Sequence, residues 1–149
     1  QYQDIKELMT DSKYEYSKIL QELFVLYITI NEYESAYDII NEKIHKCAEN
    51  NLAPYTLSTM ILDALLCYIL IDKECSKNKC DDYCKVYPTF NNSKQHKLLI
   101  GIIDAIDSNN VEEFERILRE YDKNTPLINT NVELLTKIKE KIEVQDSLC

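Results

Sequence analysis

Residues 61–72 read ILDALLCYILID, an apolar run interrupted by Asp63. The run is well short of the roughly 20 apolar residues that a membrane-spanning helix needs. Apolar and polar residues do not alternate along it, as they would in a half-buried strand. Together with the residues before it, the run predicts a helix from about Tyr55 to Asp72. Because this is the most apolar segment of the chain, we expect it to be the most buried.

The composition agrees with a helical fold. The chain has 149 residues, enough for one domain with a sizeable core, but only one glycine, three prolines and no tryptophan. Hairpin turns of β proteins and phosphate loops of α/β enzymes require glycine. The shortage of glycine therefore predicts an all-α fold of long helices with short connections.

The segment before residue 55 has apolar residues on two faces of an expected helix. One face carries Leu20, Leu23, Phe24 and Tyr27 at positions i, i+3, i+4 and i+7. Much of the other side carries Ile19, Leu26 and Ile30. We therefore expect this helix to have neighbours on two sides.

Apolar residues continue at helical spacing along the rest of the chain. Further helices are expected from about Glu34 to Glu49, from Cys75 to Tyr87, from Ser93 to Ser108, from Val111 to Tyr121 and after Pro126. The last three should face the core with Leu98, Leu99, Ile102, Ile103, Ile106, Phe114, Ile117, Leu118, Tyr121, Leu134, Leu135, Ile138 and Ile142. Pro88 stops the preceding helix, because the residue before a proline avoids helical geometry.

Helix pairs with such short connections are typical of an α-solenoid. Aligned with the 34-residue tetratricopeptide repeat, Ala64 and Ser76 occupy the small positions, and Leu23 and Tyr27 occupy the large ones. We predict tetratricopeptide-like helical hairpins over residues 1–90 and a C-terminal helical bundle with a tail over residues 91–149. The two parts should form one continuous domain.

The charge of the chain restricts its partners. Seventeen basic residues against 26 acidic ones give a net charge of −9, which disfavours nonspecific binding to nucleic acid. The same charge suits a partner with a basic surface. The six cysteines do not form a regular disulfide framework, and no secretory leader is evident, so we expect a reduced, cytoplasmic compartment.

Three cysteines, Cys75, Cys80 and Cys84, give the best case for chemistry. Cys80 and Cys84 stand one helical turn apart and could share a zinc ion. However, His45 and His96 are both distant in sequence, and cysteine also suits tight helix packing. We therefore expect structural thiols and no metal or cofactor, with zinc binding and redox sensing as minor alternatives. The chain has no phosphate loop, nucleophile elbow or His-Glu-x-x-His motif, so we expect no enzymatic activity.

Four stretches in order resemble one known family: LDALLCYILID at 62–72, YPTF at 87–90, the acidic helix end at 104–107 and DSLC at 146–149. They are similar to the C-terminal half of the soluble NSF-attachment protein (SNAP) family. From about Lys18 to Tyr121 the pattern fits without gaps, and it resumes at LLTKIKEKI. The family is about twice as long, so its N-terminal half with the membrane-touching loop is expected to be missing. The tail favours the alpha/beta type over the gamma type.

The resemblance implies an adaptor that links SNARE bundles to the hexameric NSF ATPase, which takes them apart during vesicle fusion and intracellular protein transport. Such a protein is cytoplasmic and reaches membranes peripherally through SNAREs. The alternative is a generic helical-repeat scaffold with another partner. A small thiol or zinc protein is the remaining alternative.

The resemblance also assigns roles to individual residues. The family's acidic ATPase-binding positions fall on Asp72, Asp104 and Asp107, while Ser108 replaces a further family glutamate. Carboxylates close behind could replace that lost charge: Glu112, Glu113 and Glu115. The bland alternative for all of these acids is a solvated helix surface.

Two further surfaces follow from the same resemblance. Leu148 corresponds to the tail leucine that stimulates the ATPase, although a frayed terminus is the ordinary alternative. Lys18 corresponds to a lysine on the SNARE-facing side, whereas Glu22 and Ser58 replace lysines there. The local basic stretch of Lys73, Lys77, Lys79 and Lys85 is interpreted as a solvated outer helix face.

Overall fold

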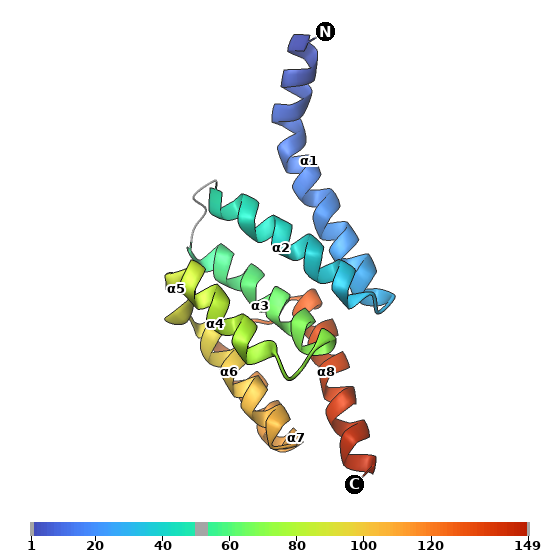
Figure 1. Cartoon of the computed structure of the whole chain (residues 1–149), viewed down its shortest axis with the longest axis vertical. Coiled ribbons are helices and arrows are strands. Elements are labelled where there is room, and N and C mark those ends of the chain that lie inside the picture. Colours follow the sequence, from blue (N-terminus) through green and yellow to red (C-terminus); the bar gives the residue numbers. More distant parts are fainter. Residues whose placement is uncertain (1, 50–53, 149) are drawn as a thin grey trace.

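The structure is a computed structural model that describes residues 2–49 and 54–148, with side chains over 15–49 and 55–142. Within these ranges the chain forms eight helices and no strand, which confirms the all-α prediction (Figure 1). The helices are α1 (Tyr2–Thr29), α2 (Tyr33–Glu49), α3 (Pro54–Ile71), α4 (Ser76–Val86), α5 (Pro88–Asn91), α6 (Lys94–Asp107), α7 (Val111–Asn124) and α8 (Asn129–Leu148).

Local chemistry explains several of these boundaries. Ser93 caps α6, and its hydroxyl accepts the His96 N–H at 3.1 Å. The Asn110 side chain caps α7 by accepting the Glu113 N–H at 3.0 Å. The turns that follow α1 and α6 contain Asn31 and Asn109 at φ 64° and φ 52°. Asparagine tolerates this left-handed conformation better than most residues.

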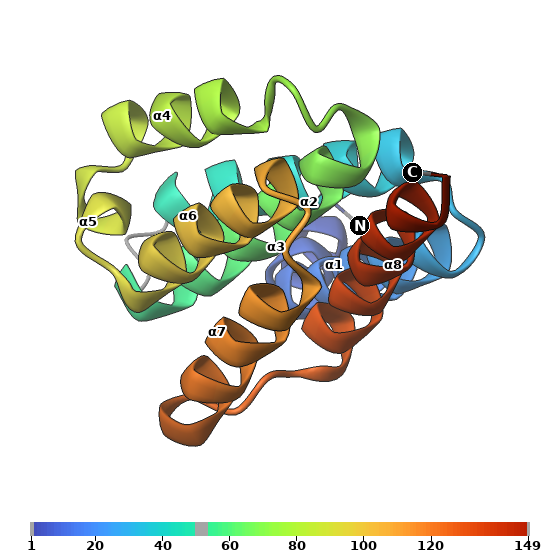
Figure 2. The ribbon, with the colours of Figure 1, turned by 90° about the horizontal axis from the view of Figure 1, so that it is seen from below.

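Helix α3 lies at the centre of the fold. It packs against α2, α4, α5, α6 and α8, while α1 packs on α2 from the outside (Figures 1 and 2). Six residues of its middle are at most 1% exposed: Ile61, Leu62, Ala64, Leu65, Leu66 and Cys67. This confirms that the segment is the most buried. Ala64 and Ser76 are both buried, as expected for small positions of a closely packed α3–α4 pair.

The last helix closes the core from the other side. Leu134, Leu135, Ile138 and Ile142 are buried as predicted, and α8 packs on α3. Two hydrogen bonds also join α8 to the N-terminal hairpin, from Lys137 to Asn31 at 2.7 Å and from Thr29 to Glu133 at 3.3 Å. One buried cluster therefore contains residues from both sides of position 90. The division of the chain at residues 90 and 91 stays a prediction.

The expectation that α1 has neighbours on two sides holds only near its end, where α1 contacts both α2 and α8. Leu20, Phe24 and Ile28 are buried against α2, but Ile19, Leu26 and Ile30 are about half exposed, at 50%, 52% and 53%. The start of α1 reaches far beyond the body of the molecule (Figure 1). Amphipathic spacing fixes which face of a helix is apolar, but not which neighbours are present to cover it.

The segment after Tyr87 also differs from the prediction. Pro88 was expected only to end a helix, yet it begins the short helix α5, in which its missing N–H is no disadvantage. Phe90 of this helix is completely buried. The segment thereby turns the chain from α4 into α6 (Figure 2). Among the described residues, no helix is long and apolar enough to cross a membrane.

Candidate functional site

Asp72 directly follows α3, and its backbone N–H donates to the Tyr68 carbonyl at 2.8 Å. The side chain is exposed, and one carboxylate oxygen accepts the Cys75 N–H at 3.3 Å. A hydrogen bond with this carboxylate, helped by its charge, raises the pKa of the exposed Cys75 thiol. Cys75 is therefore a protonated partner of Asp72 at neutral pH.

Asp104 and Asp107 lie in the last turn of α6. Both are exposed, while the neighbouring Ile103, Ala105 and Ile106 are buried. Residues three apart share a helix face, so the two carboxylates project from one side of α6. This last turn contains no basic residue, and the helix dipole adds negative potential at the same end. The arrangement concentrates negative charge instead of neutralising it.

A small cavity shows that the ends of α3 and α6 lie next to each other. It has a volume of about 240 Å³ and is lined by Ile69, Leu70, Ile71 and Lys73 near the end of α3, Ile106 of α6, and Ile138, Lys141 and Ile142 of α8. Asp72 and Asp107 each neighbour a lining residue in sequence. The structure thus brings together the helix ends that carry Asp72, Asp104 and Asp107.

Two lysines temper the negative charge there. Lys73 and Lys141 both line the cavity, and the Lys141 ammonium donates to the Leu70 carbonyl at 3.2 Å. This bond satisfies a carbonyl near the end of α3, which is a favourable place for a cation. We call the region that carries Asp72, Asp104 and Asp107 the acidic end. Its surface is mixed, with carboxylates at the rim and lysines beside them.

Two of the three acids of α7 that could replace the charge lost at Ser108 are already paired with basic residues. Arg116 donates to Glu113 at 2.8 Å through Nε, and Lys139 lies 2.6 Å from Glu115. These partners lower the pKa of both glutamates, so the carboxylates stay charged but compensated. Glu112 is exposed in the first turn of α7.

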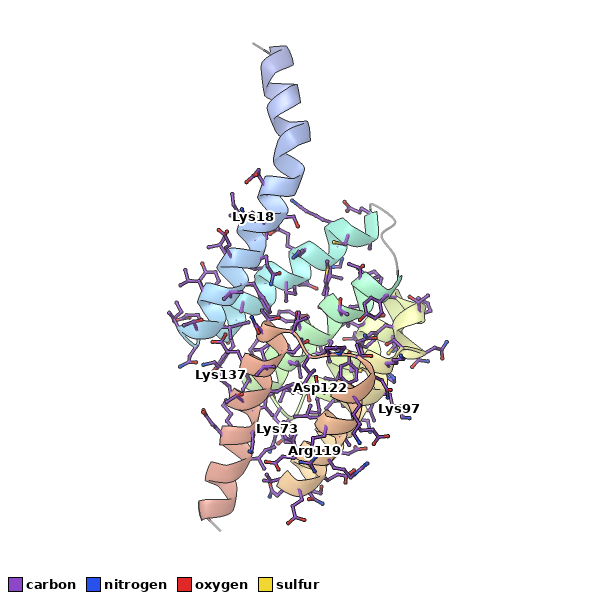
Figure 3. The ribbon with its side chains drawn as sticks, turned by 180° about the vertical axis from the view of Figure 1, so that it is seen from behind. Lys18, Lys73, Lys97, Arg119, Asp122 and Lys137 are labelled. Atoms are coloured by element: carbon purple, nitrogen blue, oxygen red, sulfur yellow. The ribbon has the colours of Figure 1, made fainter. Side chains whose placement is uncertain are left out.

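The residues expected on the SNARE-facing side are not all on the surface. Lys18 and Glu22 are exposed on α1, but Ser58 is only 3% exposed within α3. Lys18 lies well away from Lys73, which marks the acidic end (Figure 3). Leu148 is the last residue of α8, and its side chain lies outside the described residues, as does Cys149.

A cluster of possible metal ligands lies between α4 and α6. The ligand atoms of Cys80, Cys84 and His96 all lie within 4.8 Å of one another. Burial raises the pKa of Cys80 to about 12, and the two thiols are hydrogen-bonded to each other. His96 is distant from these cysteines in sequence but close to them in space, because α5 folds the start of α6 back onto α4. Cys75 is not part of this cluster.

Asp63 is the one acid inside the apolar run of residues 61–71, and its position in the sequence predicts no role for it. It is 6% exposed and accepts a hydrogen bond from the Asn131 side chain at the start of α8. Burial raises the pKa of Asp63 to about 7, opposed by this hydrogen bond and by the charge of Lys43. Because it faces the core, we interpret this pair as a structural link between α3 and α8.

The chain is similar to named proteins over most of its length. It is 28% identical to the alpha-soluble NSF attachment protein of Vitis vinifera over 118 residues, which is 78% of this chain and 41% of the relative. Identity to the protein of the same name from Dictyostelium discoideum is 29% over 114 residues, or 76% and 39%. A probable vesicular-fusion protein sec17 homolog of Neurospora crassa is 31% identical over 111 residues, or 71% and 38%.

The chain thus spans about two fifths of the length of these relatives. The model of the family described as soluble NSF attachment protein, SNAP, matches residues 4–143, which is nearly the whole chain. All helices described above fall largely within that match. On this match, the chain belongs to the soluble NSF attachment protein family.

Proposed function

We propose that this chain is the ATPase-binding part of an adaptor that connects SNARE complexes to an NSF-type ATPase, for SNARE disassembly in vesicle fusion and intracellular protein transport. Family membership and the names of the relatives support the role in NSF attachment. The observation that carries the proposal is the exposure of Asp72, Asp104 and Asp107 at helix ends on one end of the molecule.

The acidic end suits a partner with a basic surface. Exposed carboxylates accelerate encounter and fix orientation more than they add affinity. Asp104 and Asp107 project from a helix that contacts both α3 and α7, so force applied there would pass into packed helices. An adaptor that transmits the work of an ATPase needs this kind of stiffness.

We infer that α1 makes the contact with the SNARE bundle. Lys18 would face the SNARE bundle, and its distance from the acidic end keeps the two partners apart (Figure 3). Exposed Glu22 and buried Ser58 leave this side with less positive charge than the family pattern implies. We expect a correspondingly weaker grip on an acidic bundle.

The remaining assignments follow from the same proposal. Leu148 would stimulate ATP hydrolysis from the end of α8. The chain itself would have no catalytic activity and need no cofactor, since the energy would come from the ATPase. It would be cytoplasmic and reach membranes peripherally through SNAREs.

Charge reversal tests the docking assignment directly. The purified chain with Asp104→Lys and Asp107→Lys should lose most of its retention by an immobilised NSF-type hexamer. A matched control reverses two exposed acids of α4, Asp81→Lys with Asp82→Lys, which changes the net charge equally. An equal loss of retention in both variants would show that total charge, and not the acidic end, decides binding. Unchanged retention of the first variant would refute the assignment.

The tail needs a separate measurement. Removal of Leu148 and Cys149 should leave retention unchanged and lower stimulated ATP hydrolysis. A chain that binds a different helical partner and never the hexamer would instead be a general helical-repeat scaffold. That outcome would leave the fold and family membership intact.

A further inference from the structure

We propose that Cys80, Cys84 and His96 form a binding site for a thiophilic divalent cation, with Zn²⁺ as the best-fitting ion. Their ligand atoms lie within 4.8 Å of one another in the structure. Ligands around a tetrahedral Zn²⁺ lie roughly 3.5–3.8 Å apart, given Zn–S of about 2.3 Å and Zn–N of about 2.0–2.1 Å. Small side-chain rotations would close the difference.

The backbone holds the three ligands from two sides. Cys80 and Cys84 are one turn apart on α4, so their side chains share a helix face. His96 lies in the first turn of α6, where the Ser93 cap fixes its backbone N–H. Helix α5 joins α4 to α6 and brings these turns together (Figure 2). The site is therefore set by rigid elements.

The surroundings support the imidazole as well. The ring of buried Phe90 meets the His96 ring edge-on, with the centroids 5.4 Å apart and an angle of 83° between the planes. Cys80 is buried, while Cys84 and His96 are half-buried, so an ion has a route from solvent. The site is therefore partly accessible to solvent.

The chemistry of the donors selects the ion. Two sulfurs and one imidazole suit Zn²⁺, whereas Mg²⁺ and Ca²⁺ require oxygen ligands. Each thiol would release its proton to solvent on binding, and two thiolates would balance the charge of the ion. The fourth position would be taken by water. Such a centre would tie α4 to α6, the helix that ends in Asp104 and Asp107.

Cobalt titration of the reduced, chelator-treated chain tests the proposal. One equivalent of Co²⁺ should give a thiolate-to-cobalt charge-transfer band and the visible spectrum of a tetrahedral site, and Zn²⁺ should remove both. Zn²⁺ at about 100 times its Kd should raise Tm by roughly 5–10 °C. Absence of the charge-transfer band would overturn the proposal.

Variants distinguish this ligand set from others. Cys84→Ser and His96→Gln should each weaken Co²⁺ binding by roughly 100-fold or more, beyond the 10- to 100-fold typical of outer-shell changes. Both residues are half-buried, so circular dichroism should show that these variants fold, which Cys80→Ser could fail to do. Cys75→Ser is the matched control and should bind as the wild type does. Loss of binding in Cys75→Ser with none in His96→Gln would assign the ion to another ligand set and refute the proposal.

Discussion

Helices α3 and α7 differ in how much of their surface is buried and in how many charged residues they carry. The middle of α3 is buried on all sides and contains one charged residue, Asp63. Helix α7 buries one face around Phe114 and covers the other with charged residues. There Arg116 bridges Glu113 and Glu120, and Arg119 lies 3.8 Å from Glu115.

The contrast separates stability from recognition. Burial of apolar area supplies most of the favourable free energy of folding, so α3 fixes the scaffold. Exposed ion pairs such as those of α7 contribute little to stability. Charged helix surfaces and ends are therefore free to serve a partner, as proposed for α6, without weakening the core.

Truncating a side chain in each helix gives the sharpest contrast. Leu66→Ala, in the completely buried part of α3, should lower the free energy of unfolding by about 3 kcal/mol, because it leaves a cavity in the core. Leu118→Ala, on the half-buried face of α7, should cost about 1 kcal/mol. Urea denaturation measures both. Equal losses would mean that α7 is as central to the fold as α3.

The free energy of unfolding should also depend on pH, through Asp63 of α3. Its folded pKa of about 7 lies above the ordinary 3.8, so the folded state binds the proton more tightly than the unfolded state does. Stability is therefore unaffected below about pH 4, falls as pH rises towards 7, and stays reduced above that. Three pKa units correspond to about 4 kcal/mol as an upper limit.

Asp63→Asn should remove this pH dependence. The amide oxygen keeps an acceptor for Asn131 but never ionises, so the variant should gain about 2–3 kcal/mol over the wild type at pH 8 and almost nothing at about pH 3.5. Urea denaturation at both pH values is the measurement. A variant that is less stable at pH 8 would show that the charge of Asp63, paired with Lys43, favours the fold.

The sequence predicted what depends on short-range order. Apolar spacing predicted α6 to within a residue at each end, and the apolarity of residues 61–72 predicted the burial of α3. Contacts between distant residues could not be derived in this way. Asn131 meets Asp63 across 68 positions, and His96 meets Cys84 only because α5 reverses the chain. Likewise, spacing alone could not predict that the side chains of Ile19, Leu26 and Ile30 are half exposed in the described structure.

The cap of α7 should give a smaller effect. Asn110→Ala removes the acceptor of the Glu113 N–H and should lower the free energy of unfolding by about 1 kcal/mol. Asn124→Ala, at the exposed far end of the same helix, is the control and should change stability by less than about 0.5 kcal/mol. Thermal or urea unfolding distinguishes the two. A larger loss at Asn124 would place the important end of α7 at its C-terminus.

The smallest effect concerns the close approach of α6 and α7 at Gly101. A Cβ added there would lie 3.1 Å from Cδ1 of Ile117, the flexible end of that side chain. Replacing glycine inside a helix gains about 1 kcal/mol, and the displaced methyl group returns part of it. Gly101→Ala should therefore stabilise the chain by about 0.5 kcal/mol.

A double-mutant cycle identifies the opposing contact. Ile117→Val removes Cδ1, so Gly101→Ala should be more favourable in that background than in the wild type, approaching the full helical gain. Urea denaturation of the four proteins measures this coupling. An identical gain in both backgrounds would mean that Ile117 yields without cost and that the packing of α7 on α6 is loose. The contrast with the tightly packed, buried middle of α3 would then be sharper still.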